Sequence, residues 1–177
     1  MADVYAVFGT MLTLGIAFPG LLAGAWLLFP DNVGRARIRI AGTPWRSFFF
    51  GIGATLLMAL PVGILNAMPF GLAKMMSVLL VFAAFGVATM GAAAVAAELG
   101  DRLRVLSGPS LSAAGAFLRG AVALELAAVF PIVGWFLVIP GVLLAGFGAG
   151  LFGLLRWMPR PRPATIAPRA ESVPSRA

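Results

Sequence analysis

Cysteine and histidine are both missing from this sequence, and other residues that carry chemistry are scarce. Without them the chain cannot form disulfides, thiolate nucleophiles, or the zinc and haem sites that use these ligands. Charged residues make up only 11% of the chain, against about a quarter in a soluble domain. No nucleophile–base constellation, metal cluster or acid–base pair can be assembled from the remaining residues. The sequence therefore predicts a protein that is not an enzyme and that uses no metal or cofactor.

Apolar residues are abundant: they make up 61% of the 177 residues, and the mean hydropathy is +1.01. A soluble fold of this length could not bury so much apolar surface in one small core. The apolar runs are also longer and more continuous than the alternating strands of a membrane β-barrel. The composition therefore predicts an all-α, polytopic integral membrane protein.

Breaks in the apolar runs predict five transmembrane helices. The last apolar stretch, residues 112–155, would be about 66 Å long as one helix, roughly twice the 30 Å thickness of a hydrocarbon core. A turn at Pro131–Gly134 makes these last two helices a hairpin. The Pro- and Arg-rich tail, residues 156–177, is predicted to be disordered. The five predicted spans are 4–29, 47–67, 72–97, 112–130 and 135–155.

The basic residues support the same topology. With five spans, twelve of the thirteen Lys and Arg residues lie on one side and only Lys74 lies on the other, whereas four spans would divide them seven to six. The positive-inside rule then predicts an external N-terminus and a cytoplasmic C-terminus, in the inner (plasma) membrane of a bacterium. In the alternative, residues 112–134 re-enter the membrane instead of spanning it, and the tail changes sides.

Two loops and the tail carry most of the arginines. In the first loop, residues 35–40 alternate basic and apolar residues with period two, which predicts an extended or interfacial segment rather than a helix. Because the basic residues flank apolar spans, we expect them to bind anionic lipid headgroups or a partner's acidic loop, and not nucleic acid. The candidate lipid- or partner-binding residues are Arg35, Arg37, Arg39, Arg46, Arg102, Arg104, Arg156, Arg160 and Arg162.

Glu125 is the one acidic residue deep within a predicted span. An ionised carboxylate there costs roughly 3 kcal/mol on insertion scales, so it must be protonated, partnered or in contact with water. In one interpretation Glu125 handles a proton or cation; in the other its carboxyl group holds helices or subunits together. In both, it is expected to face protein rather than lipid.

Small residues recur at four-residue intervals, which leaves smooth helix faces. Such faces let two backbones approach closely, and they favour helix association in lipid. They indicate packing within the chain, against another membrane protein or in a homo-oligomer. The candidate packing residues are Gly20, Gly24, Ala84, Ala88, Ala92, Ala96, Gly146 and Gly150.

The segment Leu124–Phe136, with its Pro131-x-x-Gly134 turn, precedes the glycine-rich stretch Val142–Leu155. Together they resemble the closing helical hairpin of small bacterial membrane modules associated with bactofilin-like, polymer-forming proteins. The chain lacks the repetitive β-helical polymer domain of those proteins.

The sequence as a whole predicts a small scaffold or accessory subunit of a membrane complex. Its basic loop and tail would contact lipid headgroups or a partner protein. The alternative is a small transporter or channel in which Glu125 serves as an intramembrane proton or cation group.

Overall fold

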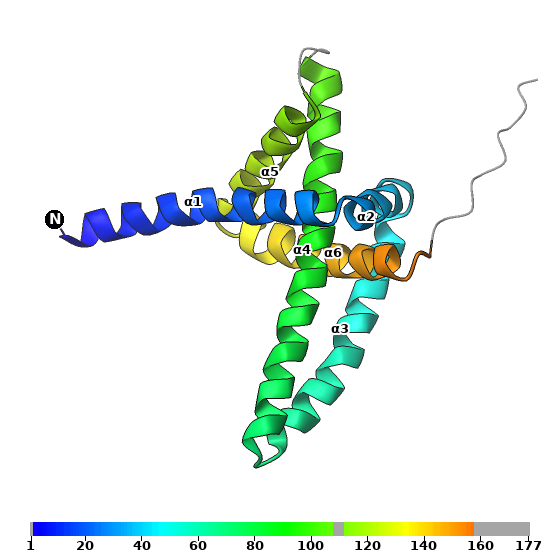
Figure 1. Ribbon diagram of the computed structural model, residues 1–177. Coiled ribbons are helices and arrows are strands. Elements are labelled where there is room, and N and C mark those ends of the chain that lie inside the picture. The colour runs from blue at the N-terminus through cyan, green and yellow to red at the C-terminus, as the bar shows by residue number, and fades with distance from the viewer. Residues whose placement is uncertain (1, 108–111, 158–177) are drawn as a thin grey trace, which may run out of the picture.

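One long helix organises the structure, a computed structural model that describes residues 2–107 and 112–157. Within these ranges the chain is helical, as predicted, and contains no strand. The 37-residue helix α4 contacts every other α-helix, and these helices lie around it (Figure 1). The elements are α1 (Ala2–Leu28), α2 (Pro30–Gly42), α3 (Pro44–Ala67), α4 (Gly71–Ser107), α5 (Ala113–Val129), the π-helical turn η1 (Gly134–Val138) and α6 (Ile139–Leu154).

The helices do not form a bundle of parallel rods. Helix α3 runs back along the first half of α4, and α5 lies along its second half (Figure 1). Near the α3–α4 turn, the Ser77 hydroxyl donates a hydrogen bond to the Val62 carbonyl at 3.3 Å. In contrast, α1 and α6 run across α4 near its middle (Figure 1).

This crossing bears on the membrane topology. In the described residues, three helices are long and apolar enough to cross a membrane: Pro44–Ala67, Gly71–Leu106 and Gly134–Leu154. A fourth span is possible if Gly15–Leu28 and Pro30–Gly42, which meet at a bend of 107°, act as one broken span. Helices that run across one another cannot all follow the membrane normal. The length and apolarity of these helices support a membrane protein, but the five predicted spans are not confirmed.

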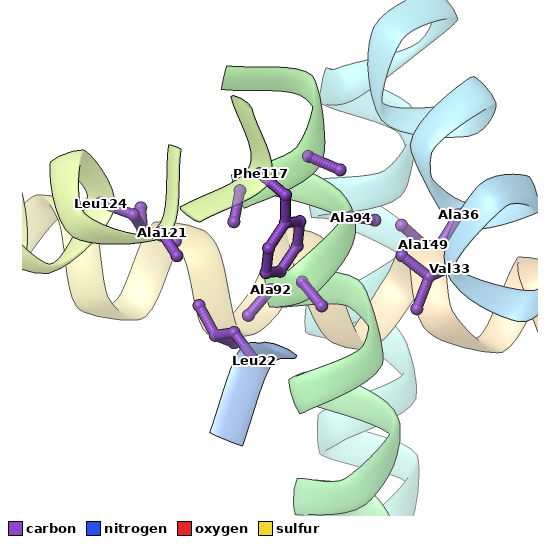
Figure 2. Packing of buried hydrophobic residues seen from close by; sticks show 12 residues of the cluster. Leu22, Val33, Ala36, Ala92, Ala94, Phe117, Ala121, Leu124 and Ala149 are labelled. Carbon is purple, nitrogen blue, oxygen red and sulfur yellow. The ribbon is translucent and has the colours of Figure 1, made fainter. Parts of the chain in front are cut away.

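Alanines dominate the core, which allows the helices to cross closely. Figure 2 shows Phe117 of α5 between Leu22 of α1 and the alanines of α4, with a second group formed by α2 and Ala149 of α6. The Phe117 ring also stacks on Trp26, with ring centroids 4.9 Å apart. Of the predicted packing alanines, Ala88, Ala92 and Ala96 are buried, whereas Ala84 is partly exposed.

Glycines bring backbones into direct contact at three crossings. A Cβ atom at Gly91 of α4 would overlap the carbonyl group of Gly146 on α6, and Gly148 of α6 meets the Ser47 carbonyl of α3 just as closely. Gly120 of α5 is equally close to the Ala96 carbonyl of α4. The predicted packing residue Gly150 contacts Val87. At two other predicted packing residues, Gly20 and Gly24, an added Cβ atom would meet nothing within 4 Å.

Two expectations about the loops are wrong. Residues 35–40 are helical, not extended, because Pro30 starts α2 and the apolar residues Val33, Ala36 and Ile40 share one helical face. The loop expected to begin at Glu98 is instead the last part of α4. That helix continues to Ser107, supported by the Glu98–Arg102 pair at helical spacing.

The predicted turn between the last two helices is present. Helix α5 ends at Val129, and the chain turns before η1 begins at Gly134. Ile132 has a positive φ of 65° in this turn. Most of the tail predicted to be disordered, residues 158–177 with Arg160 and Arg162, lies outside the described residues.

Candidate functional site

Helix α2 forms the centre of the candidate site. It is a short amphipathic helix that packs on α4 and α6, with Val33 and Ala36 fully buried. Its three arginines are partly buried, and their alkyl stems cover apolar surface. The guanidinium groups of Arg35 and Arg37 reach polar partners, whereas that of Arg39 lies over an aromatic ring.

Helical geometry sorts these arginines into two directions. Residues two apart on a helix point about 200° apart, whereas residues four apart lie nearly above one another. Arg35 and Arg39 accordingly both reach the end of α6. The Arg35 Nε donates to the Gly153 carbonyl at 2.8 Å, and the Arg39 guanidinium lies 4.1 Å from the centre of the Phe152 ring. This second contact is a cation–π interaction.

Arg37 points the other way and joins α2 to α4. Its Nε lies 3.3 Å from a Glu98 carboxylate oxygen, and its terminal nitrogen pairs with Asp101. Since Glu98 and Asp101 are three residues apart, both carboxylates lie on one face of α4, opposite Arg37. The Glu98 side chain is only 18% exposed and that of Asp101 29%, so neither acid could lose its cation without cost.

The other candidate arginines that the structure describes are more exposed than those of α2. Arg102 pairs with Glu98 at 3.0 Å while its side chain stays 69% exposed, and Arg104 lies 3.9 Å from Asp101. Arg46, in the first turn of α3, and Arg156, just after α6, are also exposed. We call the whole set the arginine surface: Arg35, Arg37, Arg39, Arg46, Arg102, Arg104 and Arg156.

The arginine surface carries an excess of positive charge. Three acids accompany its seven arginines, namely Asp31, Glu98 and Asp101. Lys74 lies at the opposite end of α4, 30 residues from Arg104 and about 45 Å away along the helix. The α3–α4 hairpin therefore has several arginines at one end and a single lysine at the other.

Glu125 is not part of this surface. It lies on α5 and is partly buried, with a carboxylate oxygen 3.3 Å from where a Cβ atom at Gly15 of α1 would stand. The carboxyl group therefore faces α1. Among the side chains that the structure describes, no hydrogen-bond or ion-pair partner of Glu125 is found.

Sequence reasoning found the arginines but not their partners. Neither Asn32, which accepts a hydrogen bond from Arg35, nor Phe152 is predicted from the sequence as a partner of these arginines. The acids Glu98 and Asp101 fall between the predicted spans 72–97 and 112–130, where the sequence predicts a loop. Their three-residue spacing is typical of one helical face and could have indicated a common partner.

The described residues contain no group of three or more acidic side chains that could hold a metal ion. Comparisons of the chain with protein-family models, with curated proteins and with solved structures find no match. The arginine surface is accordingly interpreted from its own geometry.

Proposed function

We propose that this chain is a non-enzymatic membrane scaffold whose arginine surface binds anionic lipid headgroups at the cytoplasmic face. The observation that carries the proposal is the position of α2. Its apolar face is buried on α4 and α6, and its three arginines are held by named partners. The more exposed arginines, which include Arg46 and Arg156, surround it and are available to phosphate groups.

The charge distribution supports an orientation for the α3–α4 hairpin. Both helices are long and apolar enough to span, and their arginine-rich ends meet α2. The positive-inside rule then places the arginine surface in the cytoplasm and Lys74 outside.

Single cysteines test this orientation, because the chain has no natural cysteine. In intact spheroplasts, a membrane-impermeant maleimide should label Lys74→Cys and leave Arg46→Cys unlabelled until the membrane is opened. Labelling of both sites before opening would contradict the proposed hairpin topology.

Lipid selectivity tests the function itself. The chain, purified in mild detergent, is mixed with equal amounts of phosphatidylglycerol and phosphatidylcholine, and the retained lipids are counted by native mass spectrometry. We expect phosphatidylglycerol to be retained preferentially. The double variant Arg46→Gln/Arg156→Gln should lose most of this preference, because each basic residue near the surface contributes about 1 kcal/mol, roughly fivefold.

Lys74→Gln is the matched control, since it removes one positive charge at the far end of α4. It should leave the preference unchanged. Equal retention of both lipids by the unmodified chain would refute the headgroup proposal. A partner membrane protein or a second copy of the chain would complete the scaffold role, and co-purification from native membranes in mild detergent tests for it.

The transporter alternative has less support. Glu125 faces α1, but a proton path needs further ionisable or polar groups, and the described residues place none in contact with its carboxyl group. A proteoliposome flux assay separates the two functions. A flux that Glu125→Gln abolishes would favour transport over scaffolding.

A further inference from the structure

A groove of about 450 Å³ opens between α3, α4 and α6, away from the arginine surface. Residues 55–62 of α3 and 81–88 of α4 form its walls, and residues 140–147 of α6 form its roof. Every lining side chain except Thr55 is apolar. Its volume lies within the range of about 300–1,000 Å³ that is typical of small-molecule sites.

The groove is short because both ends are closed. At one end α6 crosses the two wall helices, where Gly148 meets α3 and Gly146 meets α4 in backbone contact. Toward the other end α3 and α4 converge (Figure 1), and the Ser77 hydroxyl bonds to the Val62 carbonyl. The walls are eight residues long, or about 11 Å.

The surroundings of the groove are apolar. Its walls and roof belong to the three helices that are long and apolar enough to cross a membrane. Beside the lining residues, α3 and α4 expose Leu56, Leu60 and Phe82, which are 66%, 62% and 69% exposed. On the membrane placement proposed above, on which this inference rests, the groove opens into lipid hydrocarbon.

Bound water, an empty groove and a partner helix all fit these observations poorly. A bound water needs two to four polar partners, but the one lining hydroxyl, Thr55, already donates to the Gly51 carbonyl at 2.8 Å. An empty groove would forfeit van der Waals contacts along its whole lining. A partner transmembrane helix, about 10 Å across and 30 Å long, cannot lie along a groove closed within about 11 Å.

We infer that the groove binds one acyl chain of a membrane phospholipid. An acyl chain is narrow and flexible, and it is the apolar group present at the highest concentration around these helices. Hydrocarbon is as apolar as the groove, so burial alone gives no preference for it. The acyl chain is retained by van der Waals packing against α3, α4 and the α6 residues Leu144 and Phe147.

Photocrosslinking tests the inference. The chain is reconstituted into phosphatidylcholine vesicles that contain phosphatidylcholine with a mid-chain diazirine, irradiated, and analysed by peptide mass spectrometry. Adducts should concentrate on residues 55–62 and 81–88. Ala84→Trp fills the groove and should lower the yield of these adducts about threefold or more, because it removes the packing contacts that retain the acyl chain.

Ala83→Trp is the matched control: Ala83 is the preceding residue of α4, is exposed and does not line the groove. It should leave the adducts unchanged. Should Ala84→Trp fail to fold, Ala59→Trp fills the groove from α3 instead. Equal adduct levels in the filling and control variants would overturn the inference, as would adducts spread evenly over the outer faces of α3 and α4, or crosslinks to a second copy.

Carbonate extraction of the same vesicles separates the two proposals. If carbonate releases the chain, the membrane placement itself fails. If the chain resists extraction but shows no groove adducts, only the acyl-chain inference fails.

Discussion

Replacing Gly91 with alanine tests one of the closest helix crossings among the described residues. The added Cβ atom would overlap the carbonyl group of Gly146, so α4 and α6 would have to separate. The obstacle is backbone rather than the flexible end of a side chain, so it cannot move aside without shifting a whole helix.

The magnitude follows from two opposing effects. Overpacking of a well-packed site costs about 1–3 kcal/mol, and a backbone obstacle favours the upper end of that range. Alanine is the better helix former by about 1 kcal/mol, which offsets part of this cost. We therefore expect Gly91→Ala to lower the free energy of unfolding by about 2 kcal/mol.

Gly86→Ala is the control on the same helix. Nothing lies within 4 Å of the position that its Cβ atom would occupy, so only the helix-propensity gain of up to about 1 kcal/mol remains. The same chemical change should thus destabilise at residue 91 and stabilise at residue 86. Unfolding by sodium dodecyl sulfate in mixed micelles, followed by near-UV circular dichroism of the four tryptophans, measures both. Equal unfolding free energies for the two variants would refute the backbone contact between α4 and α6.

The other predictions concern the ion pairs and the turn between α5 and η1. Arg37→Ala should cost about 1–2 kcal/mol, because it removes the cation that two partly buried carboxylates share. Arg102→Ala removes a pair at i,i+4 spacing whose arginine is mostly exposed, and it should cost about 0.5 kcal/mol. The same micelle titration ranks the two, and a larger loss for Arg102→Ala would contradict the role of Arg37. Ile132→Gly should stabilise the protein by about 1 kcal/mol, because it relieves a β-branched residue at positive φ. Val133→Gly, at an ordinary helical φ of −65°, should destabilise it instead, and thermal unfolding that shifts both variants the same way would argue against strain at Ile132.

The behaviour of α2 shows how far local pattern can mislead. Its arginines alternate with apolar residues, and this alternation indicates an extended segment when it is considered alone. In the structure the same spacing directs Arg37 toward α4, and it directs Arg35 and Arg39 toward α6. The helix is stabilised by partners 60 or more residues away in the chain, which no local pattern reports.

The candidate site was predictable in its residue types and unpredictable in its arrangement. Charge asymmetry was enough to select the arginines as a group. Whether a given arginine is tied to its own chain, as Arg37 is, or stays exposed, as Arg46 does, depends on which helices meet. The apolar groove had no sequence signal, because its lining residues look like any other residues of apolar helices.

The sequence by itself determined the helical, membrane-compatible class of this protein and the main breaks between helices. The reason is local: apolar composition selects lipid as the solvent, lipid requires every backbone group to be bonded within its own helix, and proline, which has no N–H to donate, interrupts that bonding. Only the tertiary structure decided that α1 and α6 cross α4 instead of lying beside it (Figure 1). That choice depends on small residues meeting at particular pairs, such as Gly91 with Gly146, and on steric fit between helix surfaces far apart in the chain.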